Sequence, residues 1–128
     1  MKKVYRLRKN EQFHTVRSKG RSWANRWLVL CALPNDLPYS RFGFTVSRRV
    51  GSAVVRNRAR RLLREAVRLR RETIAPGWDL VFVARAPMKE AAFHEVDRAV
   101  EQLLRRARLL LPDPDDEESQ ERVKKDEE

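Results

Sequence analysis

The chain has 128 residues and a formal net charge of +11, from 29 lysines and arginines against 18 acids. This length supports one hydrophobic core, and the positive charge favours a nucleic-acid or anionic-membrane partner. No apolar run is long enough to span a membrane, and the N-terminus lacks the apolar core of a signal peptide, so we expect a cytoplasmic protein without a membrane segment.

The charge is unevenly distributed along the chain. Residues 112–128 hold nine acids and three bases, a net charge of −6, so residues 1–111 carry +17. The acidic segment has two prolines and almost no apolar residues, which is typical of disorder. We therefore expect one folded basic domain over residues 1–111, which binds nucleic acid or an anionic membrane, and a disordered tail over 112–128. Such a tail either folds back on the basic surface as a nucleic-acid mimic or acts as a solubilising extension.

A short helix is expected after the basic residues 1–9. Asn10 is a candidate N-cap, two polar residues follow in the first turn, and Gly20 ends the helix. Phe13, Val16 and Arg17 project from this helix. Core packing and ligand contact both remain open for Phe13 and Val16.

Three apolar runs predict strands over residues 26–33, 41–47 and 79–85. The first two are separated by a Pro-Asn-Asp-Leu-Pro turn, so we expect them to pair as an antiparallel hairpin. The third follows a helix, and a crossover of this kind makes it parallel to the second. Alternation in the first strand places Trp27, Val29, Cys31 and Leu33 on one face.

The most informative stretch is residues 50–71, which form an amphipathic helix on a helical wheel. Ser52 is a candidate N-cap for a helix that begins at Ala53. The expected buried stripe is Val55, Ala59, Leu62, Ala66 and Leu69, widened by Leu63 and Val67. The opposite half carries Arg56, Asn57, Arg60, Arg61, Arg64, Arg68 and Arg71, with Arg58 and Arg70 at the flanks.

Two acids dilute this cationic face. Glu65 can pair with Arg61, and Glu72 with Arg68, each four residues earlier. The remaining like charges at i, i+4 repel one another, and a polyanion would offset that cost. Arginine grips phosphate with two parallel hydrogen bonds and stacks on bases, so this face favours a nucleic-acid partner.

The segment over residues 44–64, FTVSRRVGSAVVRNRARRLLR, closely resembles the signature of the bacterial ribonuclease P protein component. The hallmark of that family is an Arg-Asn-Arg core, which stands here as Arg56, Asn57 and Arg58. The runs RLRKNEQF at residues 6–13 and ANR at 24–26 extend the resemblance over roughly residues 4–110.

The resemblance implies an α+β fold: a two-layer sandwich with about four strands in a mixed sheet and three helices, similar to ribosomal S5 domain 2. It also implies a left-handed βαβ crossover around the basic helix, whereas general handedness rules predict the opposite hand. The implied function is that of a protein subunit of a ribonucleoprotein endoribonuclease, which removes the 5′ leader of precursor tRNA.

Partners and sites follow from the same resemblance. The partners are the ribonuclease P RNA and precursor tRNA, with the protein a monomer in a 1:1 particle, and the RNA subunit holds the catalytic Mg²⁺. The residues that dock on the RNA would be Arg48, Arg49, Arg56, Asn57, Arg58, Arg60, Arg61, Arg64 and Arg68. The leader cleft would be lined by Phe13, Arg17, Trp27, Val29 and Cys31. Family members often have an aromatic residue in place of Arg17 and a tyrosine in place of Cys31.

Two other functions are weighed against this one. A ribosomal or general RNA-binding protein would carry a similar basic helix. A protein enzyme acting alone would need metal ligands or an acid–base pair, and His94 with Asp97 on the last helix, expected over residues 92–111, is the nearest candidate. Helix surfaces carry such groupings routinely, and the sequence has no phosphate-binding Gly-rich loop. We therefore expect no catalytic residue and no metal site in this chain.

Overall fold

The computed structural model describes residues 1–112, and the predicted acidic tail from residue 113 lies outside the described residues. The described part contains four strands and three α-helices, which confirms the α+β class. The strands are β1 (Arg21–Ala24), β2 (Leu28–Pro34), β3 (Arg41–Thr45) and β4 (Trp78–Ala84). The helices are α1 (Asn10–Lys19), α2 (Ala53–Arg70) and α3 (Phe93–Arg106), with short 3-10 turns at Lys3–Tyr5, Arg71–Thr73 and Ala86–Glu90.

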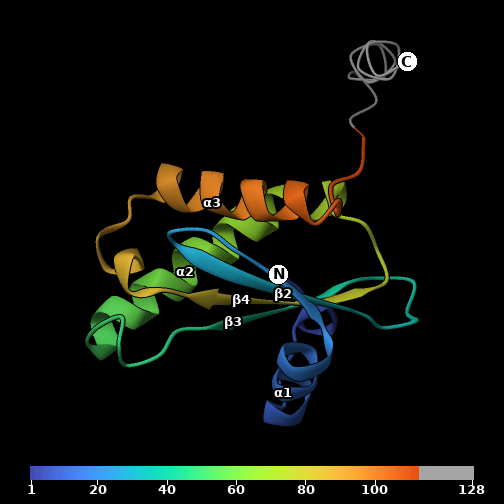
Figure 1. Cartoon of the computed structure of the whole chain (residues 1–128), viewed down its shortest axis with the longest axis horizontal. Helices are drawn as coiled ribbons and strands as arrows, with labels where there is room; N and C mark the ends of the chain where they lie inside the picture. The colour runs from blue at the N-terminus through green and yellow to red at the C-terminus, as the bar shows by residue number, and fades with distance from the viewer. Residues whose placement is uncertain (113–128) are drawn as a thin grey trace.

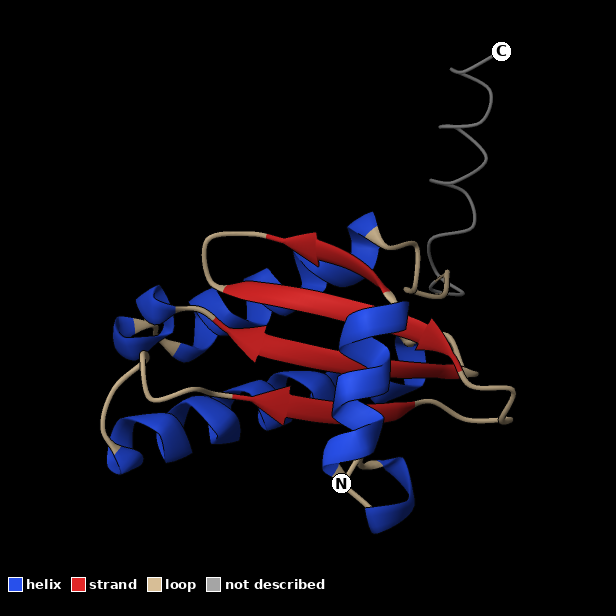
Figure 2. Cartoon of the chain, turned by 60° about the horizontal axis from the view of Figure 1, so that its bottom comes forward, coloured by secondary structure: helices blue, strands red, loops and turns tan. Residues whose placement is uncertain are grey.

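The helices lie on both faces of one sheet. Helices α2 and α3 cover one face, and α1 crosses the other (Figures 1 and 2). The larger core lies under α2 and α3, where Leu30, Phe82 and Leu103 are fully buried. A smaller cluster under α1 contains Val16 and Cys31. Alternation along β2 supplies both clusters, as the sequence pattern predicts for residues 28–33.

The strand order is β1-β2-β4-β3, with β4 antiparallel to β2 and parallel to β3. The predicted hairpin between the first two apolar runs is therefore wrong, because β4 lies between them. Leu80, Val81 and Phe82 of β4 are fully buried, as expected for the central position in a sheet covered on both faces. The path from β3 through α2 to β4 is a left-handed crossover, as the family resemblance implies (Figure 2).

The predicted strand over residues 26–33 is also incorrect at its start. Asn25 accepts hydrogen bonds at Oδ1 from the backbone N–H groups of Trp27 (3.0 Å) and Leu28 (2.9 Å), and this turn divides the apolar run into β1 and β2. The Asn25 amide also donates to the carbonyl oxygen of Ala99 (3.1 Å), which ties the turn to α3. Trp27 therefore lies before β2 and packs toward the core on the α2 and α3 side, away from α1.

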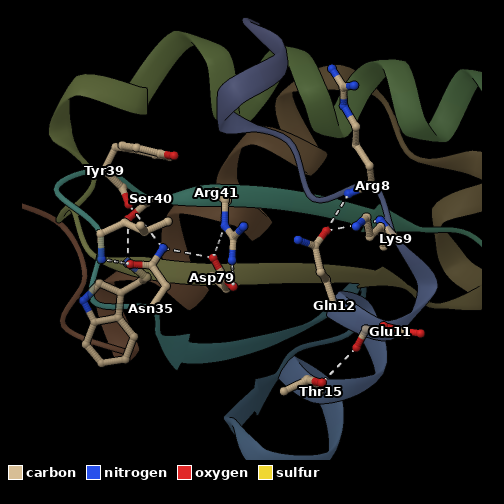
Figure 3. Close-up of polar contacts among 12 residues, drawn as sticks. Arg8, Lys9, Glu11, Gln12, Thr15, Asn35, Tyr39, Ser40, Arg41 and Asp79 are labelled. Carbon is tan, nitrogen blue, oxygen red and sulfur yellow. Dashed lines mark hydrogen bonds and ion pairs between the residues drawn. The ribbon is translucent and has the colours of Figure 1, made fainter.

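The ends of α1 and α3 differ slightly from expectation. Asn10 is the first residue of α1, and the N-cap is Lys9. The start of the helix is held by Gln12 Oε1, which accepts hydrogen bonds from the backbone N–H groups of Arg8 (3.1 Å) and Lys9 (3.2 Å) (Figure 3). Helix α3 ends at Arg106, before residue 111. Arg108 adopts a left-handed conformation (φ 60°), and the backbone then bonds to the segment after α2, with Leu111 N donating to the carbonyl oxygen of Thr73 (2.6 Å).

One charged pair is built into the α1 side of the sheet. Arg41 on β3 donates from Nε (2.8 Å) and Nη2 (2.7 Å) to the two carboxylate oxygens of Asp79 on β4 (Figure 3). Asn35 donates to the same carboxylate (3.0 Å). Asp79 is 6% exposed, so the bidentate pair offsets the cost of burying its charge and ties the edge strand to the central one.

Candidate nucleic-acid interface

Helix α2 begins where the sequence predicts. Ser52 has extended backbone angles, and its Oγ accepts a hydrogen bond from the Val55 backbone N–H at 3.4 Å, so it is the N-cap. The turn before it is closed by Val50 N donating to the carbonyl oxygen of Ser47 (3.1 Å), and Val50 is buried. Arg48 and Arg49 project from this turn and are exposed, next to the positive end of the helix.

The buried stripe of α2 is shifted from the predicted one. Ala59, Leu63, Ala66 and Val67 are buried, whereas the predicted member Leu69 is 59% exposed. The displacement follows from the packing of α3 on one side of α2.

Two arginines of α2 contact α3 and the segment that precedes it. Arg70 forms an ion pair with Asp97 of α3, and Arg58 donates to the carbonyl oxygen of Ala91 (3.0 Å). Arg58 and Arg70, predicted at the flanks of the stripe, therefore lie along the α3 side.

Three guanidiniums on the opposite edge of α2 lack acidic partners. The ion pairs formed within residues 1–112 do not include Arg56, Arg60 or Arg64. Arg60 donates a hydrogen bond to Asn57 Oδ1 (2.9 Å). This bond orients the side chain of Arg60 together with that of Asn57, the middle residue of the Arg-Asn-Arg core. The pKa of Arg64 is lowered by burial and by the positive charges of Arg6 and Arg60. An anion at this edge would relieve both effects.

Arg6 is a member of this cationic edge that the sequence analysis did not assign. Its segment runs beside β3, with a parallel bridge between Arg6 and Phe42 and a hydrogen bond from Leu7 N to the Phe42 carbonyl oxygen (2.9 Å). In the described part of the chain, the Nε atoms of Arg6, Arg56 and Arg64 are buried without a hydrogen-bond partner, as is that of Arg70 on the α3 side. The sequence signal was only the basic character of residues 1–9, because strand pairing places Arg6 next to α2.

The acids on α2 pair differently from the prediction. Glu65 bonds Arg68 three residues later (2.6 and 2.9 Å) and not Arg61, and this hydrogen bond lowers the pKa of Glu65. Glu72 consequently does not pair with Arg68 in this structure. Arg61 and Asn57 are exposed on the outer face of α2. Of the residues predicted to dock on the RNA, Arg68 is the one whose guanidinium is paired with a carboxylate, Glu65, within residues 1–112.

A cavity of about 670 Å³ lies between α1, β3 and α2. Phe13 and Arg17 line it from the helix, Phe44 and Thr45 from the strand, and Arg60 from α2. Asn10, His14, Ser18 and Val46 complete its lining. The lining thus combines the Phe13 ring with two guanidiniums, whereas the Phe44 ring is stacked on Phe82 of the larger core (6.0 Å between centroids). Arg60 belongs both to this cavity and to the cationic edge of α2.

The floor of this region depends on a glycine. A Cβ added to Gly43 would come within 2.5 Å of Cε1 and 2.7 Å of Cζ of Phe13, so the absence of a side chain lets the ring lie on β3. This contact fixes the height of α1 above the sheet at the cavity.

The five residues predicted for the leader cleft are not all brought together. Phe13 and Arg17 line the cavity, whereas Cys31 is buried beneath α1 and Val29 is half-buried beside it. Burial raises the pKa of the Cys31 thiol, with an opposing effect from Arg17. Trp27 lies on the other side of the sheet, under the Arg26 guanidinium (4.8 Å from the ring centroid). Phe44, Thr45 and Arg60 also line this cavity; Arg60 was predicted for the RNA-docking set, and Phe44 and Thr45 were assigned to no site.

The acid and histidine of α3 do not form a site together with the cavity. Asp97 is the partner of Arg70, and His94 lies beside Trp27 and Arg98. Within residues 1–112 there is no group of three or more His, Cys, Asp or Glu side chains that could hold a metal ion. None of the helices in this part of the chain is long and apolar enough to cross a membrane.

Known proteins resemble this chain in sequence and in structure. Residues 1–108 match the Ribonuclease P family. The ribonuclease P protein component of Roseiflexus castenholzii is 54% identical over 111 residues, covering 86% of this chain and 91% of the relative. That of Chloroflexus aurantiacus is 48% identical over 118 residues, covering 91% and 87%.

Solved structures agree. The Staphylococcus aureus RNase P protein superposes with a TM-score of 0.78 at 32% identity, covering 84% of this chain and 99% of that one. The Thermotoga maritima RNase P protein gives 0.73 at 31% identity, covering 79% and 96%. With the family match spanning most of the chain, this protein belongs to the ribonuclease P protein family.

Proposed function

We propose that this ribonuclease P protein subunit binds the catalytic RNA through the cationic edge and outer face of α2, and holds the single-stranded 5′ leader of precursor tRNA in the cavity beside α1. The observation that carries the proposal is the row of guanidiniums on α2, Arg56, Arg60 and Arg64, that have no carboxylate partner among residues 1–112. The docking set is the one given by the family resemblance, and Arg6 is added to it because it lies beside Arg64.

The α2 surface suits a folded RNA. Arg56, Arg60 and Arg64 repeat every four residues, so they form one row along the helix. The hydrogen bond from Arg60 to Asn57 orients one member of the row, and the Nε atoms of Arg56 and Arg64 are buried. A phosphate can accept hydrogen bonds from the outer nitrogens of these guanidiniums. Each neutralised phosphate releases counterions, so binding through this row weakens steeply with salt.

The cavity suits a single strand. Phe13 offers an aromatic ring on which a base can stack, and Arg17 and Arg60 offer charge for the backbone. Stacking is tolerant of base identity, which fits a leader that varies between precursors. Because Arg60 serves both surfaces, the leader and the catalytic RNA would lie side by side.

We place the hydrolysis in the RNA subunit, together with its Mg²⁺ ions. The protein groups that line the cavity are aromatic, cationic and neutral polar, so their contribution is to bind and orient the leader and to neutralise phosphate charge. Neutralising phosphates near the cleavage site lowers the demand for diffuse cations, and the protein would therefore lower the Mg²⁺ concentration that cleavage requires. We propose one protein copy per RNA.

Reconstitution tests this function. Adding the full chain to a bacterial ribonuclease P RNA should lower the Mg²⁺ requirement for cleavage of precursor tRNA, and the benefit should shrink with a substrate whose leader is a single nucleotide. Failure to stimulate at any protein concentration would favour a general RNA-binding protein. Cleavage by the RNA-free protein, lost in His94→Ala or Asp97→Asn, would instead show a protein enzyme.

A further inference from the structure

A second cationic surface lies at the far end of α2, away from the turn that carries Arg48 and Arg49. Two adjoining cavities of about 340 and 490 Å³ share Tyr5, Arg71 and Glu72. Lys2 and Arg68 line one of them, and Tyr39 and Leu111 the other. We call these two cavities together the N-terminal groove.

Aromatic contacts hold the centre of this groove in place. The Arg71 guanidinium lies 4.1 Å from the centroid of the Tyr5 ring, and Tyr5 meets Tyr39 edge to face at 5.7 Å between centroids. Arg71 forms no ion pair within residues 1–112, although Glu72 is adjacent. Its positive charge is therefore positioned by stacking and remains available to an anion.

The groove is also partly apolar. Leu69 is 59% exposed and Leu111 is 44% exposed, and both line the groove. Exposed leucines beside fixed cations make a surface suited to an acidic peptide and less suited to a bare phosphate backbone.

The chain itself supplies such a peptide. Leu111 lines the groove, and its backbone N–H is bonded to the carbonyl oxygen of Thr73 (2.6 Å), so the chain leaves the domain at this place. Residues 113–128 follow directly and carry nine acids against three bases. The family match ends at residue 108, before this segment begins.

We propose that the acidic segment 113–128 binds across the N-terminal groove, with its carboxylates on Lys2, Lys3 and Arg71. Tethering at Leu111 gives the segment an effective concentration on the order of millimolar at this groove, so weak ion pairs suffice. The cationic edge of α2 is within the segment's reach, which is about 50 Å when fully extended. Leu111, from which the segment continues, lines the groove and not the cavity beside that edge, so the groove is the surface next to the tether. This inference goes beyond the proposed function and does not depend on RNA.

Coupling of carboxylates to amines by a carbodiimide tests the proposal on the full chain without RNA. Lys2, Lys3, Lys9, Lys19 and Lys89 are all exposed, so each can react. Mass spectrometry should find the tail acids linked within one molecule to Lys2 and Lys3 in large excess over Lys19 and Lys89, with the excess lost in high salt. Links spread evenly over the five lysines, or concentrated on Lys9, Lys19 or Lys89, would overturn it.

Opposite changes in the tail give a second, independent readout. Neutralising Asp115, Asp116, Glu117 and Glu118 to their amides should speed amide hydrogen exchange over residues 68–73. Changing Arg122, Lys124 and Lys125 to Gln makes the tail more acidic and should slow exchange there. Exchange over residues 96–104 in α3 is the internal control and should not change. Equal exchange at residues 68–73 in both variants would refute the docking.

Discussion

Replacing Arg60 and Arg64 with glutamine removes the centre of the cationic row on α2. Glutamine keeps part of the aliphatic stem, so the packing against β3 is largely retained. The free protein should not be destabilised, because the Arg64 guanidinium is already disfavoured by burial and by Arg6 and Arg60. RNA binding, in contrast, should lose two charge-assisted contacts.

The size of the loss can be worked out from the contacts. Hydrogen bonds to charged groups contribute roughly 1.5–3 kcal/mol each, and neighbouring arginines do not add fully, so we expect about 3 kcal/mol for the pair. This corresponds to an increase of roughly 150-fold in Kd. The slope of log K against log salt should also become shallower by about 1.4–1.8, since two phosphates are no longer neutralised.

The assay is equilibrium binding to ribonuclease P RNA over a series of salt concentrations, with thermal unfolding of each variant. The matched control replaces Arg98 and Arg108, both exposed, which removes the same net charge from the α3 side. An equal loss for both pairs would mean that net charge alone drives binding. Unfolding of the Arg60 and Arg64 variant would mean that these side chains support the fold, and either result would refute the reasoning.

Three further predictions concern stability and the thiol. Arg41→Met should lower the unfolding free energy by about 3 kcal/mol in urea titrations, because it leaves the buried Asp79 carboxylate without its cation. This value is the low end of the range for breaking a buried ion pair, since the Arg41 side chain is 25% exposed. A loss under about 1 kcal/mol would contradict the prediction. Gly43→Ala should cost about 1–3 kcal/mol by pressing on Phe13, and Phe13→Leu in the same chain should recover part of it, whereas additive losses would refute the contact. Cys31 has a raised pKa, so maleimide should react slowly with the native protein at pH 8 and rapidly in urea. Its contribution to stability should decline above about pH 8.5, where the unfolded thiol loses its proton first; equal native and unfolded rates would contradict its burial.

Local patterns in the sequence predicted the elements well. The Ser52 cap, the start of α2 at Ala53 and the alternation of β2 and β3 depend on neighbouring residues, and the structure confirms them. Strand order depends on which apolar run is covered on both faces, and that is settled by helices distant in sequence. The insertion of β4 between β2 and β3, and the split of one apolar run at Asn25, could not be found from local pattern alone.

The candidate site was predictable to the same extent. The charged half of α2 follows from helical period, so its arginines could be assigned. Leu69 and Trp27 were misplaced because α3 displaces the buried stripe and the Asn25 turn redirects the chain. Arg6 joined the site through pairing with β3, a contact between segments more than thirty residues apart.

The central claim is that this chain works on the ribonuclease P RNA. Native purification from its own cells, followed by sequencing of the bound RNA, tests it most directly. The account predicts that ribonuclease P RNA is the most enriched species, and that its recovery falls sharply when Arg60 and Arg64 are replaced. Enrichment of ribosomal RNA instead, or recovery of ribonuclease P RNA that does not depend on these arginines, would contradict it.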